Sequence, residues 1–342
     1  MRKKIATILF IILAILAGCG KKDSIIEEKG ESDNDSVKIG VSFDSFIIER
    51  WERDRDIFVS AAKDLGAEVN VQNANGEVNE QIAQIEYFIK KKMDVIVVIP
   101  IDGRTLTSVI QKAKNAGIAV ISYDRMVMDA DTDMYISFDN EAVGRMMGTA
   151  IASDPLIKKV IMICGSKSDN NVSMIEKGFI PIMEEKGIEI VDKTYCDGWK
   201  ADLAYEYINE NIALVDNADA IMCGNDDIAT NVIRALAVNR RAGDITVVGQ
   251  DADLTACQHI VEGTQKMTVY KPVEKLASEA ARYAVMLANG ENIDVDLKIN
   301  DGTYDVPYVA LQPISVNIDN IDSVIIDGGF HIKEDVYLNV NK

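Results

Sequence analysis

The regular alternation of β-branched apolar runs with amphipathic segments is the feature that most limits what this chain can fold into. Runs rich in Val and Ile cover residues 37–43, 67–71, 94–100 and 118–123, and segments with helical spacing cover residues 47–65, 78–92 and 105–116. Gly66 and Gly117 directly follow two of these segments, and glycine is favoured just past a helix end. Near-continuous apolar strands separated by helices are typical of parallel sheets covered on both faces.

The same pattern starts again in the second half of the chain. Strand-like runs there cover residues 159–164, 188–195, 218–223, 245–249 and 267–270. The sequence therefore predicts an α/β protein with two doubly wound parallel-sheet lobes.

The limits of the two lobes follow from a late helix at residues 273–289, which has no obvious place unless the chain returns to the first lobe. We therefore expect a hinge of three segments, with crossings near 135–140, near Lys271–Pro272 and near 311–314. The predicted N-terminal lobe comprises residues 37–138 plus 272–311, and the predicted C-terminal lobe comprises residues 139–271 plus 312–342.

The N-terminal segment has the pattern of an export signal. Three cations at positions 2–4 precede an apolar run at residues 5–16. This run is too short for a permanent membrane span, which needs about 20 apolar residues. The pattern predicts a signal peptide over residues 1–18.

A lipid attachment site is expected directly after the signal peptide. Residues 16–19 (LAGC) resemble the lipobox of bacterial lipoproteins, which makes Cys19 the expected lipidation site. Residues 19–36 are charged and rich in Ser and Gly, and this composition predicts a flexible tether. The expected location is extracytoplasmic, with the protein anchored to the cell membrane as a lipoprotein and touching the membrane through this lipid only.

The net charge of the chain argues against two classes of partner. The formal net charge is −19, and loss of the three signal-peptide cations lowers it to −22. Nucleic acids and anionic lipid headgroups bind through Lys and Arg, so we expect neither as a partner.

The remaining cysteines and the histidines suggest no reactive centre. Cys164, Cys196, Cys223 and Cys257 form no C-x-x-C pair, so free buried thiols are expected, although an exported protein can also form disulfides. His259 and His331 are the only histidines, and both are expected to be surface or capping groups. We expect no metal, no cofactor and no catalytic residue.

Polar residues follow nearly every predicted strand. In open α/β sheets, ligands bind beyond the carboxyl ends of the strands. The residues at these ends are Asp44, Glu49, Arg50, Trp51, Asp124, Arg125, Ser166, Asp169, Asn170, Asn171, Asp197, Gly198, Trp199, Gly224, Asn225, Asp226, Gln250, Asp251 and Lys271. They mix acceptors with donors, as neutral polyols require, because each hydroxyl both donates and accepts hydrogen bonds.

One further role and one alternative concern individual members of this set. Trp51 and Trp199 are the only tryptophans, and flat rings of this kind can cover the apolar faces of a pyranose. Asp124, Asn225 and Asp226 could instead serve only as helix N-caps, where Asp and Asn are favoured.

Nine stretches of the sequence resemble the D-xylose-binding branch of the periplasmic sugar-binding protein family. They are ERWERDRDIF (49–58), QNANG (72–76), YDRM (123–126), DADTDMYISFDNE (129–141), DNN (169–171), DGW (197–199), GND (224–226), GQDADL (249–254) and GTQKMTVYKP (263–272). The resemblance implies the fold of type I periplasmic binding proteins and a ligand site made by Arg50, Trp51, Asp124, Arg125, Asp169, Asn171, Trp199, Asn225, Asp251 and Lys271. Cys164, Lys167 and Cys223 depart from the usual family pattern, which bears on affinity.

The function implied by the resemblance is capture of a monosaccharide, D-xylose above all, and its delivery to an ABC-type permease by hinge closure. The alternative is a sugar sensor whose closed form signals to a membrane sensor kinase or chemoreceptor. An enzyme is not expected, although counting carboxylates alone does not exclude a glycosidase pair. A repressor core is disfavoured by the export signal and by the lack of a basic helix-turn-helix.

Overall fold

The computed structural model describes residues 36–340. The predicted signal peptide, Cys19 and the tether as far as residue 35 therefore lie outside the described residues. Among residues 36–340, no helix is both long enough and apolar enough to span a membrane.

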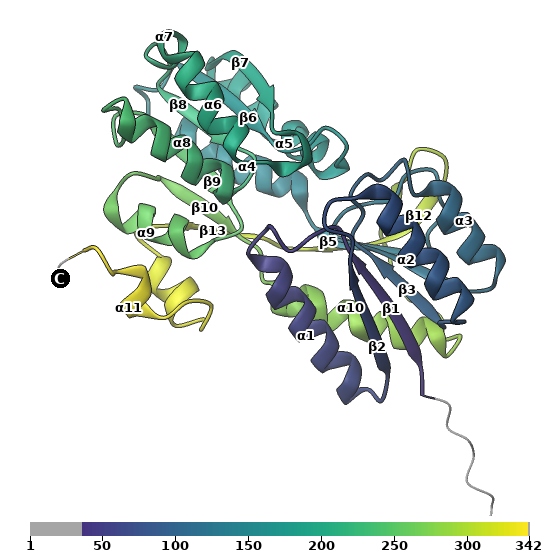
Figure 1. The fold of residues 1–342 in the computed structure, drawn as a ribbon. Coiled ribbons are helices and arrows are strands. Elements are labelled where there is room, and N and C mark those ends of the chain that lie inside the picture. The colour runs from purple at the N-terminus through teal and green to yellow at the C-terminus, as the bar shows by residue number, and fades with distance from the viewer. Residues whose placement is uncertain (1–35, 341–342) are drawn as a thin grey trace, which may run out of the picture. The chain divides into compact units, whose positions relative to one another are not determined.

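A seven-stranded sheet organises the first lobe, with the strand order β11-β12-β5-β4-β3-β1-β2 (Figure 1). Its strands are β1 (Lys38–Phe43), β2 (Glu68–Asn73), β3 (Val95–Val98), β4 (Ala119–Tyr123), β5 (Met134–Phe138), β11 (Lys298–Asn300) and β12 (Asp305–Leu311). Its helices are α1 (Arg50–Asp64), α2 (Val78–Lys90), α3 (Thr107–Asn115) and α10 (Val273–Ala288). We call these elements the N-terminal lobe.

Helices cover both faces of this sheet because its strands are apolar on both sides. Val95 and Val97 of β3 pack in one cluster with residues of α1 and α10. Ile96 and Val98 pack in another cluster with residues of α2 and α3. Successive strand residues point to opposite faces, so this single run of four apolar residues serves both layers.

The second lobe is built on a six-stranded sheet with the order β13-β10-β9-β8-β6-β7. Its strands are β6 (Lys159–Cys164), β7 (Glu189–Tyr195), β8 (Ala220–Cys223), β9 (Thr246–Gln250), β10 (Met267–Tyr270) and β13 (Ile314–Asn317). Its helices are α4 (Asn140–Ala152), α5 (Asn170–Lys186), η1 (Asp197–Trp199), α6 (Asp202–Glu210), α7 (Ile212–Val215), α8 (Asp226–Val238), α9 (Leu254–Glu262), η2 (Asp322–Ile326) and α11 (Lys333–Val336). We call these elements the C-terminal lobe.

The chain passes between the two sheets three times, after β5, after β10 and after β12. As a result α10 lies among elements of the N-terminal lobe and packs against α1, although it follows β10 in sequence (Figure 1). We propose residues 37–138 plus 272–311 and 139–271 plus 312–342 as the two lobes, because each set contains every strand of one sheet.

Two edge strands differ from the purely parallel sheets expected from the sequence. β11 pairs antiparallel with β12, and β13 pairs antiparallel with β10. Both strands are short, with three residues in β11 and four in β13, and they lack the long Val/Ile runs that marked the parallel strands. The remaining pairs in both sheets are parallel.

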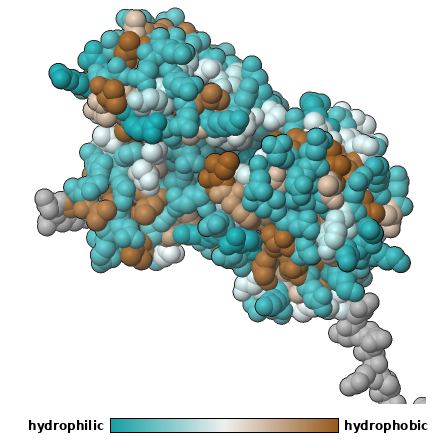
Figure 2. Space-filling view, viewed as in Figure 1, coloured by the Kyte–Doolittle hydropathy of each residue, from teal (hydrophilic) through white to brown (hydrophobic). Residues whose placement is uncertain are grey.

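The four cysteines beyond Cys19 are free and buried, as predicted. Burial raises the pKa of the Cys196 thiol to about 11 and raises the pKa values of the other three thiols further. These thiols stay protonated at neutral pH and are therefore weak nucleophiles. Hydrophilic residues cover most of the face seen in Figure 2, in keeping with the high net charge.

Candidate ligand-binding site

The carboxyl ends of strands from both lobes surround a narrow cavity. It is lined by Ile48, Arg50, Trp51, Asp124, Arg125, Asp169, Asn171, Trp199, Asn225, Gln250, Asp251 and Lys271. The structure therefore brings all ten residues named from the sequence to one place, although the two most distant in sequence are more than two hundred residues apart. In the described part of the chain, no group of His, Cys, Asp or Glu is arranged to hold a metal ion.

Arg50 is the centre of the charge network in the N-terminal lobe. It opens α1, and its Nη2 lies 2.9 Å from Asp124 Oδ2 and 3.2 Å from Asp54 Oδ1. Tyr123 Oη also donates to Asp54. Across the cavity, Arg50 Nη1 lies 3.9 Å from Asp251 Oδ1 in the C-terminal lobe.

The free-energy cost of burying these charges is offset by the opposite charges beside them. Burial lowers the pKa of Arg50, but Asp124, Asp54 and Asp251 outweigh it and raise that pKa well above its ordinary value. Burial likewise raises the pKa of Asp124, but Arg50, Lys271 and Arg125 reverse the direction and hold it below its ordinary value. Both groups are therefore charged at neutral pH.

Arg125 connects the two lobes directly. Its Nη1 donates to Asp44 Oδ2 at 2.7 Å within the N-terminal lobe, and its Nε lies 2.9 Å from Asp169 Oδ2 in the C-terminal lobe. Asn171 makes a second connection, because it accepts from Tyr135 Oη at 2.8 Å and donates through Nδ2 to the Asp124 carbonyl at 2.9 Å.

Of the three residues that could serve only as helix N-caps, one caps a helix in the structure. Asn225 is the N-cap of α8 and accepts from Ile228 N at 3.0 Å through Oδ1, while its Nδ2 is buried without a partner. One atom of this side chain thus caps the helix and the other is available to the cavity. Asp124 caps no helix, and Asp226 is buried behind the site, where Thr268 Oγ1 donates to it at 2.6 Å.

Both tryptophans line the cavity, together with the guanidinium groups. The Cζ atom of Arg50 lies 4.5 Å from the centroid of the Trp51 ring. The Cζ atom of Arg125 lies 5.6 Å from that of Trp51 and 5.8 Å from that of Trp199. Trp199 rests on Gly165, where a Cβ atom would come within 2.2 Å of the indole. Arg50 and Trp51, although adjacent in sequence, therefore both face the site.

Several buried polar atoms of the cavity have no hydrogen-bond partner in the protein. The donors are Trp51 Nε1, Trp199 Nε1 and Asn225 Nδ2, and the acceptor is Gln250 Oε1. Asp124 Oδ2 and Asp251 Oδ1 have cationic neighbours but no hydrogen bond. Buried polar atoms are nearly always paired, so a cluster of both kinds indicates a ligand that donates and accepts.

Two residues of the cavity were not in the predicted ligand set: Gln250, which was named only as a strand-end polar residue, and Ile48, which was not named. Gln250 donates through Nε2 to the Gly224 carbonyl at 2.6 Å, which leaves its Oε1 free for the cavity. Its position at the end of β9, directly before Asp251, was the available signal. Ile48 carries no such signal because it is apolar.

The residues that depart from the family pattern lie outside the lining of the cavity. Cys164 and Cys223 are buried in the sheet. The Nζ atom of Lys167 lies 4.3 Å from the centroid of the Tyr195 ring. His331 was expected to be a surface or capping group. In the structure its Nε2 instead lies 2.8 Å from the Ala252 carbonyl oxygen, beside Asp251.

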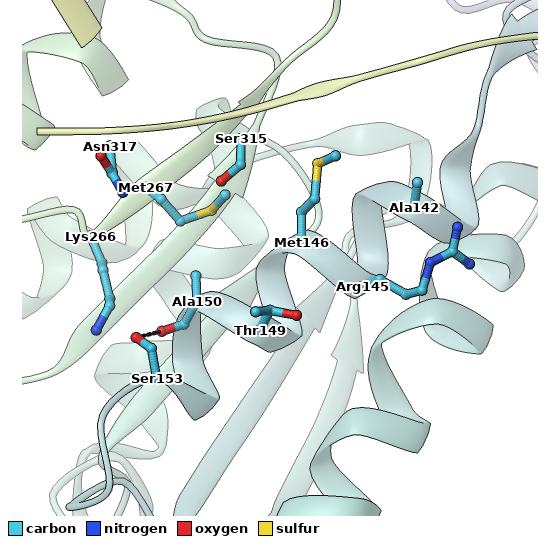
Figure 3. A pocket seen from close by; sticks show the side chains of 10 residues that line it. All are labelled: Ala142, Arg145, Met146, Thr149, Ala150, Ser153, Lys266, Met267, Ser315 and Asn317. Carbon is cyan, nitrogen blue, oxygen red and sulfur yellow. Dashed lines mark hydrogen bonds between the residues drawn. The ribbon is translucent and has the colours of Figure 1, made fainter. Parts of the chain in front are cut away.

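A larger groove lies elsewhere in the C-terminal lobe, between α4 and the strands β10 and β13 (Figure 3). Met146 and Met267 face it, with Arg145 and Lys266 at its sides. It contains none of the ten residues named from the sequence, and it lacks the paired buried charges of the cavity.

Comparison with known proteins agrees with this architecture. Residues 39–292 match the family model described as a periplasmic binding protein domain. The chain belongs to the periplasmic binding protein family. This membership makes it an extracytoplasmic solute receptor and not an enzyme, as the sequence predicted.

Members of this family that resemble the chain include two curated relatives and a solved structure. The D-xylose-binding periplasmic protein of Haemophilus influenzae is 42% identical, with 88% of this chain and 92% of the relative covered. The protein of the same name from Escherichia coli K12 is 42% identical over 86% and 91% of the two chains. An ABC transporter solute-binding protein from Clostridium phytofermentans with bound β-D-glucose superimposes with a TM-score of 0.80 at 26% identity, covering 87% of this chain and 99% of that chain.

Proposed function

We propose that this protein binds a monosaccharide, D-xylose, in the cavity between its lobes. The observation that carries the proposal is the set of buried donors and acceptors that lack protein partners at a site flanked by charged groups and two indoles. Two relatives that are 42% identical to the chain are named D-xylose-binding proteins, which supports the choice of sugar.

The chemistry of the lining suits neutral hydroxyl groups. Each sugar hydroxyl donates one hydrogen bond and accepts up to two. In our proposal the carboxylates of Asp124, Asp169 and Asp251 accept, and Arg50, Arg125 and Lys271 donate. Hydrogen bonds to charged groups are shorter and stronger than neutral ones. Asn171 and Asn225 add amide groups, and the two indoles cover the apolar faces of the ring.

The proposed mechanism is closure of the two lobes around the sugar. A ligand that contacts both lobes binds the closed form better and shifts the population toward it. Arg125 supports this mechanism because it contacts Asp44 in one lobe and Asp169 in the other.

Calorimetric titration against D-xylose, D-ribose, L-arabinose and D-glucose tests the proposal. We expect one site per chain, with D-xylose the tightest ligand and a change in tryptophan fluorescence on binding. The absence of heat and of a fluorescence change with all four sugars would overturn the assignment.

We further propose that a lipid on Cys19 anchors the protein and that the closed form delivers its sugar to an ABC-type permease. Expression of Cys19→Ser in the native host should move the protein from the membrane fraction to the soluble fraction. Co-purification of the membrane-anchored protein with and without D-xylose should recover the permease. Recovery of a sensor kinase or chemoreceptor in its place would favour the sensing alternative.

A further inference from the structure

Helix α1 begins with two arginines, three residues apart, that contact the C-terminal lobe at different places. Arg50 lines the ligand cavity and faces Asp251. Arg53 lies outside the cavity and donates from Nη1 to the Phe330 carbonyl at 3.0 Å. Its Cζ atom lies 4.0 Å from the centroid of the Phe330 ring. The sugar site therefore does not explain the contact made by Arg53.

Phe330 is held firmly in the C-terminal lobe. Its ring lies 4.7 Å from that of Tyr270 and 4.5 Å from that of His331, measured between centroids. It is buried in one apolar cluster with Val316 and Ile325. The segment that carries it precedes α11, which packs on α9 (Figure 1). Arg53 thus docks onto a fixed feature of the opposite lobe.

His331 continues this contact to the backbone next to the proposed ligand carboxylate. Its Nε2 lies 2.8 Å from the carbonyl oxygen of Ala252, and the Ala252 N–H donates to Thr268 Oγ1 at 3.1 Å. Asp251 and Ala252 have φ values of 103° and 58°, which non-glycine residues adopt only when their surroundings hold them there. Thr268 thus holds the peptide group before Ala252, and His331 holds the one after it, where the Cys257 thiol also donates to the Ala252 carbonyl at 3.6 Å.

A carboxylate completes the contact at the lobe boundary. Glu274, at the start of α10, lies 3.8 Å from Arg53 Nη1 and accepts from Tyr270 Oη at 3.1 Å. Arg53 is consequently oriented by groups on both sides of the hinge segment that follows β10.

We infer that Arg53, Phe330 and His331 form an interlobe latch that holds the closed form and positions Asp251 without contacting the ligand. The inference rests on the proposed function, because the latch acts when the lobes close. One end of α1 then joins the two lobes twice, through Arg50 at Asp251 and through Arg53 at Phe330, whose neighbour His331 contacts the Ala252 carbonyl. These are positioning residues, and their removal should shorten the life of the closed complex.

The test compares Arg53→Ala with the matched control Arg55→Ala. Arg55 lies on the same helix and is similarly exposed, but it contacts Asp56 and the Phe46 ring within its own lobe. Stopped-flow tryptophan fluorescence should show D-xylose dissociating about tenfold faster from Arg53→Ala, which corresponds to about 1.4 kcal/mol. Dissociation from Arg55→Ala should be unchanged, and both variants should melt at the temperature of the unaltered protein when no ligand is present.

A variant of His331 tests the second half of the latch. His331→Ala should weaken D-xylose binding, and His331→Gln should recover most of the loss because its amide can still donate to the Ala252 carbonyl. Equal affinities for His331→Ala and the unaltered protein would show that the Ala252 carbonyl needs no such support, and would overturn this half of the inference.

A ligand-free measurement separates failure of the latch from failure of the proposed function. Spin labels attached after Lys91→Cys and Glu184→Cys substitutions, one in each lobe, report the interlobe distance without sugar. Arg53→Ala should reduce the short-distance population relative to Arg55→Ala. Equal distance distributions together with equal dissociation rates would overturn the latch, whereas absence of sugar binding by the unaltered protein would overturn the proposed function alone.

Discussion

The two lobes contribute different chemistry to the same cavity. The charged side chains from the N-terminal lobe are already paired within that lobe, since Arg50 contacts Asp54 and Asp124, and Arg125 contacts Asp44. The C-terminal lobe has one such pair, Lys271 with Asp251 at 3.3 Å. The C-terminal lobe contributes the amides and three of the four atoms without any partner, on Trp199, Asn225 and Gln250.

This difference suggests that the two lobes have different roles in ligand binding. Paired charges hold their positions before the ligand arrives, and such preorganisation lowers the cost of binding. Buried amides without a hydrogen-bond partner are costly, and a ligand that pairs with them removes that cost. The N-terminal lobe would therefore recognise the sugar with fixed charges. The unpartnered polar atoms of the C-terminal lobe would obtain hydrogen-bond partners from the sugar when the lobes close.

The largest effect is expected from removing the central charge of the N-terminal lobe. Arg50→Ala should weaken D-xylose binding about 1,000-fold or more, because it removes a charged donor and leaves buried carboxylates unpaired. The same substitution should lower the free energy of unfolding by about 3–5 kcal/mol. Calorimetric titration and urea unfolding measure the two effects. Retained affinity would show that the N-terminal charges are structural only.

A smaller effect is expected from the C-terminal lobe at Asn225. Asn225→Ser keeps a side chain that can cap α8 but removes the buried amide donor, so affinity should fall about 10- to 100-fold, the range expected for one unsatisfied buried group. Stability should change little, because Ser is about as good an N-cap as Asn. The control Asn225→Ala should lose the same affinity and also about 1 kcal/mol of stability. Equal stability losses in the two variants would contradict the dual role of this side chain.

The position of the Trp199 indole in the C-terminal lobe depends on the absence of a side chain at Gly165. Gly165→Ala would place a Cβ atom within 2.2 Å of the Trp199 ring and displace the indole, so affinity should fall about tenfold, in line with the cost of overpacking. Near-ultraviolet circular dichroism should report the displacement. In a Trp199→Ala background, Gly165→Ala should have no further effect on affinity. An additional loss of affinity there would show that Gly165→Ala acts through a residue other than Trp199.

The smallest effect concerns pH and a carboxylate at the start of α8 in the C-terminal lobe. Burial, with help from Asp251 and Glu49, raises the pKa of Asp227 to about 6. An acid with a raised pKa in the folded state stabilises the fold at low pH and loses that contribution as the pH rises through the folded pKa. Asp227→Asn should therefore flatten the fall in unfolding free energy between about pH 4 and pH 6, the interval between the ordinary pKa of an Asp and the raised pKa of Asp227, measured by urea unfolding. An unchanged slope would assign this pH dependence to other groups.

The local pattern of the sequence was enough to name most of the residues that line the candidate site. Each strand end is recognisable from its own Val/Ile run, and in parallel sheets these ends meet at one edge. Asp124, Asp169 and Lys271 were therefore identifiable from the strands that precede them. Gln250 was visible by the same rule, but nothing in the sequence distinguished a buried amide with one free atom from an ordinary polar residue.

What the sequence determined by itself is thus the alternation of strands and helices, the two lobes and the set of residues at the strand ends. The tertiary structure alone decided which of these residues pair with one another, as Arg125 does with Asp44 and Asp169, and that the short strands β11 and β13 run antiparallel. It also decided that Arg53 meets Phe330, 277 residues later in the chain. The physical reason is that periodicity and propensity act over a few neighbouring residues, whereas ion pairs, edge strands and interlobe contacts depend on distances that only the packed fold fixes.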